Sequence, residues 1–167
     1  MTRLSALWQR NVVAAVVVAC TVGAFIAIDF GPQWSAYRHT LTPQLAVAQG
    51  DSGSADGQTW ELVSIRHLNR TPLNFGPPLP EGTVLTVIVV DWSGTPRSGY
   101  CSATLTDGER RWDDEGVAGF SPIPPEGVKA LCDGPGRIQF GFVVPADVVP
   151  TAMDITHDRQ ITVRMLL

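Results

Sequence analysis

The stretch SGYCSATLTDGERRW (residues 98–112) decides the fold class, because it has the pattern of a β-hairpin. Cys101, Ala103 and Leu105 alternate with polar residues, which is the two-residue period of a strand. Asp107 and Gly108 then interrupt the alternation with a dipeptide that is typical of tight turns. We therefore predict a strand, a turn and a second strand here, with a cysteine on the apolar side of the first.

The β pattern continues on both sides of this hairpin. Further strands are predicted at residues 59–68, 82–92, 136–145 and 160–166, and the apolar run 84–90 is typical of a central strand covered on both faces. Proline-rich loops between them exclude long helices. Roughly six or seven short strands separated by turn signals predict an all-β fold, an immunoglobulin-like antiparallel β-sandwich. An antiparallel barrel is the alternative. The expected core aromatic residues are Trp60, Trp92, Trp112, Phe140 and Phe142.

The N-terminal part of the chain has a different composition. From Val12 to Ile28 there is no charged residue, and this length of apolar sequence suits a helix that crosses a bilayer. Trp8 precedes the run and Trp34 follows it, as expected for aromatic side chains at the two interfaces. Arg3 and Arg10 lie before the run, so the positive-inside rule places the N-terminus in the cytoplasm.

These patterns predict four segments. Residues 1–10 are a cytoplasmic N-terminus, 11–30 a single transmembrane helix, 31–57 a linker and 58–167 the extracytoplasmic β-sandwich. The linker is expected to be flexible because it contains breakers and a Gly/Ser/Asp tract but no apolar period. The predicted location is the cell membrane, with a single pass and the C-terminal domain outside the cytoplasm.

Two alternatives to an uncleaved anchor remain open. A cleaved signal peptide needs small residues just after the apolar run, whereas Ala46 and Ala48 lie far downstream of it. A lipoprotein would use Cys20 at the end of "VVAC", but the apolar run continues past this cysteine to Ile28.

The predicted β domain contains two cysteines, Cys101 and Cys132. In an oxidising compartment, an even pair in one small domain predicts a disulfide. A pair of buried free thiols, or a redox or metal role, is the alternative. No histidine lies at ligand spacing beside either cysteine, which disfavours a metal site.

Charge and motifs narrow the possible chemistry. A net charge of −4 disfavours a nucleic-acid partner. The sequence has no nucleophile elbow, phosphate-binding loop or dinucleotide fingerprint, so we expect no catalytic residues, no cofactor and no metal. The one cluster that could bind a cation or ligand is acidic: Asp91 at a strand end, and Asp113, Asp114 and Glu115 after the hairpin. Paired acids can also serve glycosidic chemistry.

Four segments carry a resemblance to a known family: TWELVSI (59–65), LPEGTVLTVIVVDW (79–92), YCSATLTDGERRW (100–112) and RIQFGFVVPADV (137–148). Together they resemble the immunoglobulin-like extracytoplasmic domains of actinobacteria, the family of the mycobacterial immunogenic secreted antigen. The resemblance covers residues 58–167, and the hairpin is shortened relative to the family pattern. It implies a sandwich fold and a cell-envelope location, and it contributes no catalytic residues.

The function expected from these features is a membrane-anchored, non-enzymatic interaction module or accessory subunit. A protein partner would bind through an edge strand or through the proline-rich loops 75–82 and 120–127. The alternative is an envelope ligand- or cation-binding domain, or a hydrolase, that uses the acidic cluster.

Overall fold

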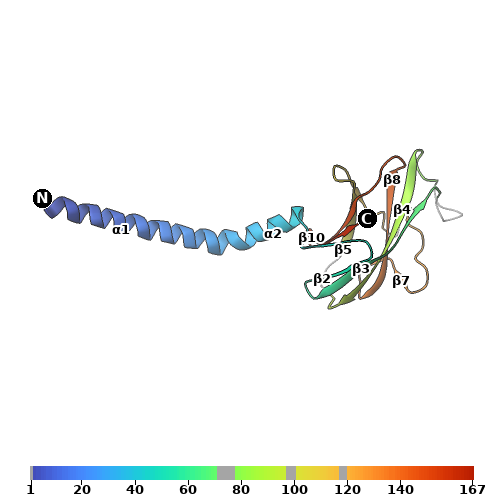
Figure 1. The fold of residues 1–167 in the computed structure, drawn as a ribbon, viewed down its shortest axis with the longest axis horizontal. Helices are drawn as coiled ribbons and strands as arrows, with labels where there is room; N and C mark the ends of the chain where they lie inside the picture. Colours follow the sequence, from blue (N-terminus) through green and yellow to red (C-terminus); the bar gives the residue numbers. More distant parts are fainter. Residues whose placement is uncertain (1, 71–77, 97–100, 117–119) are drawn as a thin grey trace. The chain divides into compact units, whose positions relative to one another are not determined.

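The computed structural model describes residues 2–70, 78–96, 101–116 and 120–167. The chain forms two compact units, Met1–Arg38 and His39–Leu167. The first unit is helical and the second is built from strands (Figure 1).

The first unit contains the predicted apolar helix. Helix α1 (Thr2–Phe25) continues through a π-helical turn, η1 (Ile26–Phe30), into α2 (Gly31–Leu41). By its length and composition, this helical segment is long enough and apolar enough to cross a membrane. The π-helical turn ends two residues before Pro32, which has no N–H to donate to a carbonyl one turn earlier, so the regular helical ladder is interrupted in this turn.

The segment 31–57, predicted as a linker, is structured in several places. It contains α2 and two short strands, β1 (Leu45–Val47) and β2 (Ser52–Ala55). The first β-structure therefore begins at residue 45 instead of 58. The prediction failed because two apolar residues in alternation are too short a signal among the surrounding breakers, and pairing with distant strands supplies the missing stability.

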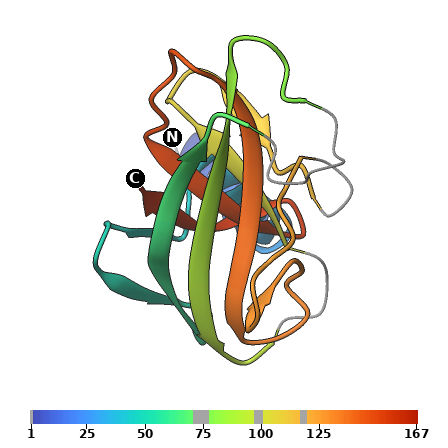
Figure 2. The same cartoon turned by 90° about the vertical axis from the view of Figure 1, so that its right-hand side faces the viewer.

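The second unit is a β-sandwich of two five-stranded sheets. One sheet has the order β1-β10-β9-β5-β6 and the other β2-β3-β4-β8-β7. Most neighbouring strands are antiparallel, but β1 runs parallel to β10 and β7 parallel to β8. Figure 2 shows β3, β4 and β8 side by side. The remaining bounds are β3 Gln58–Leu68, β4 Thr83–Gly94, β5 Cys101–Thr106, β6 Arg111–Asp113, β7 Val128–Lys129, β8 Gly136–Pro145, β9 Ala152–His157 and β10 Gln160–Leu166.

The core lies between the sheets and contains most of the predicted aromatic residues. Trp60 and Trp92 stack with ring centroids 5.5 Å apart. Phe140 and Phe142 are buried on β8, whereas Trp112 is only partly buried against the core. Every residue of β4 from 85 to 90 is buried, which confirms the prediction of a central strand covered on both faces.

The turn of the predicted hairpin is longer than expected, and one central strand was not predicted. The hairpin between β5 and β6 has a four-residue connection, because Thr106 pairs with Arg111. Asp107 stabilises it by accepting hydrogen bonds at Oδ1 from the amides of Glu109 and Arg110, and these bonds hold the pKa of its carboxyl below the usual value. Strand β9 was not predicted at all.

Candidate functional site

The structure separates the predicted acidic residues. Asp91 lies on β4, with its Oδ2 3.6 Å from Nε of Arg137. Asp113 lies on β6 in the other sheet and accepts a hydrogen bond of 3.1 Å from the Thr104 hydroxyl. In the described ranges, no group of three His, Cys, Asp or Glu side chains could hold a metal ion. The four acids of the predicted cation site are therefore not assembled around one point.

Asp114 has a different environment from its neighbours. Its Oδ1 accepts a 2.7 Å hydrogen bond from the amide of Gly141 on β8, and its Oδ2 accepts one of 3.2 Å from the amide of Gly116. The amide of Glu115 in turn donates to the carbonyl of Gly141 over 2.8 Å. This segment thus connects the edge strand β6 of one sheet to β8 of the other.

The partial burial of Asp114 changes its acidity. Burial raises the pKa of its carboxyl, and the two backbone hydrogen bonds oppose this effect without cancelling it. The negative charge of Glu115 also raises it. Asp114 is the one predicted site residue that combines burial, a raised pKa and a place in a pocket.

The pocket beside Asp114 has a volume of about 120 Å³. We call it the β8 pocket, since it lies where the proline-rich loop meets that strand. Within the described ranges its lining residues are Asp114, Gly116, Ser121, Pro122, Ile123, Pro124, Ala130 and Gln139.

Gln139 attaches the proline-rich loop to β8. It alternates with the core residues Ile138 and Phe140, so its side chain faces away from the inter-sheet core. Its Nε2 donates a 2.6 Å hydrogen bond to the carbonyl of Pro122, while Oε1 accepts no hydrogen bond from any residue that the structure describes. Only 4% of the residue is exposed. A buried amide oxygen without a donor is costly, and such groups call for a physical explanation.

Gln139 is not among the site residues that the sequence predicts. A weak signal exists, because Gln139 is the one polar residue between Ile138 and Pro145. Ser121 and Ile123 were included only as parts of the loop 120–127. The first three residues of the other predicted loop, 75–77, lie outside the described residues.

Gly141 provides the first test of this packing. A Cβ at position 141 would lie 2.5 Å from Oγ and 3.0 Å from Cβ of Ser121. We expect Gly141→Ala to displace the loop and to lower the free energy of unfolding by about 1–3 kcal/mol, because the backbone must shift to relieve the overlap. Urea unfolding followed by near-UV circular dichroism measures the change.

The matched control is Gly134→Ala, where the added Cβ would meet only Nζ of Lys129, the mobile end of a long side chain, at 3.2 Å. Equal stability of the two variants would contradict the close packing of the loop on β8.

The predicted cysteine pair is confirmed. Cys101, the first residue of β5, and Cys132 form a disulfide with Cα atoms 5.8 Å apart. Cys20 on α1 is a free, exposed thiol. The disulfide fixes the end of the segment that carries the β8 pocket, because Cys132 follows Ala130 closely in the chain.

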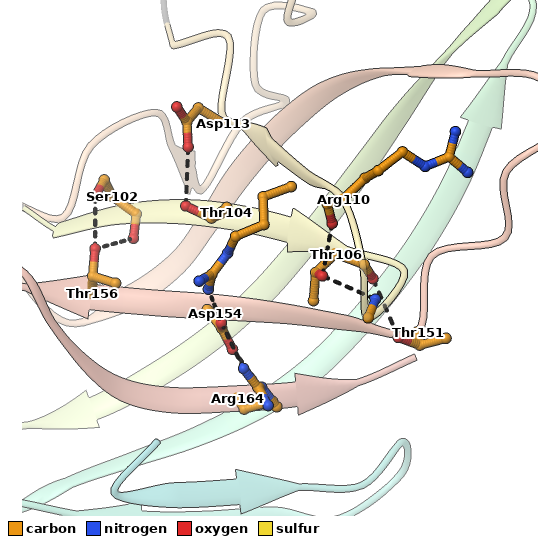
Figure 3. Close-up of polar contacts among 11 residues, drawn as sticks. Ser102, Thr104, Thr106, Arg110, Asp113, Thr151, Asp154, Thr156 and Arg164 are labelled. Atoms are coloured by element: carbon orange, nitrogen blue, oxygen red, sulfur yellow. Dashed lines mark hydrogen bonds and ion pairs between the residues drawn. The ribbon is translucent and has the colours of Figure 1, made fainter. Parts of the chain in front are cut away.

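A second polar cluster lies on the outer face of the sheet formed by β10, β9 and β5. Its centre is Asp154, whose side chain is fully buried. Arg164 binds it in a bidentate manner, with Nε–Oδ1 at 2.6 Å and Nη2–Oδ2 at 2.8 Å (Figure 3). Arg111 reaches the same Oδ2 from β6. The hydrogen bond to Asp154 raises the pKa of Arg164, so this side chain stays charged.

Comparison with known proteins leaves the family of this chain open. No family model matches the chain. No curated protein matches it. A solved crystal structure of an uncharacterized β-sandwich protein from Clostridium difficile 630 is similar, with a TM-score of 0.39 and 13% sequence identity over 73% of this chain and 93% of that chain. The resemblance to the actinobacterial family stays a prediction.

Proposed function

We propose that this chain is a membrane-anchored interaction module of the cell envelope, with its β-sandwich outside the cytoplasm and without enzymatic activity. The observation that carries the proposal is the disulfide between Cys101 and Cys132 in a domain that follows an apolar helix. Disulfides persist mainly in oxidising compartments. The arginines before the helix favour the same orientation, and the resemblance to actinobacterial envelope domains agrees with it.

The edges of the two sheets favour loops over edge strands as the binding surface. The four edge strands are short: three residues in β1 and in β6, four in β2 and two in β7. Short edges offer few free backbone groups to an added strand. In contrast, Ile123 and Leu131 are exposed apolar side chains on the segment that ends at the disulfide. Exposed apolar groups on a fixed loop are typical of protein contact sites.

The local contacts of the acids support a non-enzymatic role. Asp91 faces Arg137, Asp113 accepts from Thr104, and Asp114 accepts from two backbone amides. Each of these three carboxylates thus has a structural partner of its own. A hydrolase that uses two acids needs both carboxylates on one substrate bond, and this arrangement gives no support to it.

The test places a photoreactive residue, p-benzoylphenylalanine, at position 123 of the full chain in cells that have been stripped to spheroplasts. We expect a discrete cross-linked adduct of one mass, which an externally added protease degrades. The matched control carries the same residue at position 149, where Val149 is an equally exposed apolar side chain beyond the other end of β8. We expect no such adduct there.

Two outcomes would overturn the proposal. If the protease spares the β domain until the membrane is permeabilised, the domain does not lie outside the cytoplasm. If positions 123 and 149 give the same diffuse adducts, the proline-rich loop is not a specific contact surface.

A further inference from the structure

We infer that the β8 pocket binds an alkylammonium group, a primary amine at the end of a short aliphatic stem. The inference rests on the chemistry of the pocket lining and depends on neither the membrane anchor nor a protein partner. Its polar groups are the carboxylate of Asp114, the amide of Gln139 and the hydroxyl of Ser121. These groups are mostly acceptors, so a matching ligand has to donate hydrogen bonds.

Charge favours a cation at this place. Within the described ranges, neither lysine nor arginine lines the pocket or forms an ion pair with Asp114. Among the described residues, the hydrogen-bond donors to Asp114 are the neutral backbone amides of Gly116 and Gly141. Both of its oxygens keep a further lone pair, because a carboxylate oxygen accepts two hydrogen bonds. A charged ammonium group can therefore add to the existing contacts without displacing them.

Gln139 is the independent observation that points to a ligand. The residue is 96% buried, it lines the pocket, and its Oε1 lacks a donor in the described part of the chain. The orientation of the amide is fixed, because Nε2 donates to the carbonyl of Pro122. An N–H donor that enters the pocket would remove the cost of the unpaired oxygen.

The rest of the lining favours an alkyl stem over a metal ion. Pro122, Ile123, Pro124 and Ala130 present apolar surface beside the polar groups. Calcium takes six to eight oxygen ligands, usually with several carboxylates, whereas the described part of this lining supplies one carboxylate, that of Asp114. The volume of about 120 Å³ is well above the roughly 10–15 Å³ that a single water needs, so an ammonium group on a short run of methylenes has room to enter.

Two sources could supply this group, a lysine side chain of a protein or a free small amine. The test therefore uses two probes, Nα-acetyl-lysine methylamide and n-butylammonium, titrated calorimetrically into the full chain in lipid nanodiscs at neutral pH. We expect saturable binding, and at least about tenfold weaker binding of the Nε-acetylated lysine probe, because it has lost the charge. Tighter binding of the lysine probe identifies a protein ligand; equal or tighter binding of n-butylammonium identifies a free amine. Both results support the site.

The decisive variant is Asp114→Asn, which keeps the shape of the side chain and an acceptor for Gly141. We expect it to weaken both amine probes at least about tenfold. The matched control is Asp113→Asn, a neighbouring acid outside the pocket, and we expect it to bind as the unchanged chain does. If Asp114→Asn fails to fold, Ala130→Leu tests the same site by filling the pocket while the carboxylate remains.

Three outcomes would overturn the inference. The first is the absence of saturable amine binding. The second is equal affinity of the charged and the acetylated lysine probes, and the third is equal affinity of the Asp114 and Asp113 variants. If the first outcome is accompanied by calcium binding that Asp114→Asn abolishes, the ligand of the pocket is a metal ion instead of an alkylammonium.

Discussion

Replacing Cys101 or Cys132 by serine is expected to lower the free energy of unfolding by about 3–4 kcal/mol. The two cysteines are 31 residues apart in sequence. In the chain-entropy model, a cross-link that closes a loop of this length removes conformations from the unfolded chain and stabilises the fold by about that amount. The loop contains β5, β6, β7 and most of the residues that line the β8 pocket, so the loss affects both the sandwich and the candidate site.

The measurement is pulse proteolysis of the full chain in urea, with and without a reductant. Cys20→Ser is the matched control, because this thiol is free and exposed on the helix. We expect it to leave the urea midpoint unchanged. Alkylation of the unreduced protein should label Cys20 alone. Labelling of all three cysteines without reduction, or equal midpoints in oxidising and reducing buffer, would contradict the stabilising role of the disulfide.

The long strands could be predicted from the sequence because each has a complete local signal. The runs 136–145 and 160–166 coincide with β8 and β10, since both alternate apolar residues over several positions between turn residues. The cysteine pair was predictable for a different reason. Two thiols in one small domain leave only one intramolecular pairing.

Elements that depend on long-range contacts could not be predicted in this way. β9 pairs with β5 and β10 on its two sides, and Asp154 in its centre breaks the apolar pattern. A charged residue in a strand predicts an exposed or edge position for that strand. Here the charge of Asp154 is instead neutralised by two arginines from other strands. The β8 pocket could not be predicted either, because it also depends on a long-range contact. Gln139 reaches Pro122 only once the proline-rich loop lies against β8.

The cluster around Asp154 combines one buried carboxylate with two arginines. The carboxylate is fully buried, while Arg164 and Arg111 are 30% and 48% exposed. Asp154 lies directly between Thr104 on β5 and Arg164 on β10. The two guanidinium groups therefore cover a charge that water does not reach, and their remaining surface stays hydrated. Such an arrangement is stable only while all its charges are paired.

Asp154→Asn is expected to lower the free energy of unfolding by about 2–4 kcal/mol. Removal of one partner of a buried ion pair costs about 3–5 kcal/mol, and the partial exposure of both arginines reduces this cost. Without the carboxylate, two positive charges face each other across a neutral amide. Urea unfolding of the full chain by near-UV circular dichroism, which reports the buried Trp60–Trp92 stack, measures the change.

Asp113→Asn is the control, since Asp113 is exposed and makes one hydrogen bond to a hydroxyl. We expect its effect to stay within about 0.5 kcal/mol.

A triple variant removes every charge of the cluster together: Asp154→Leu, Arg164→Met and Arg111→Met. It should recover most of the lost stability, because a well-packed apolar replacement of a buried charge cluster is often neutral or stabilising. If Asp154→Asn costs no more than Asp113→Asn, the carboxylate does not hold the three strands together. If the triple variant is less stable than Asp154→Asn, the hydrogen-bond geometry of the arginines matters more than the balance of charge.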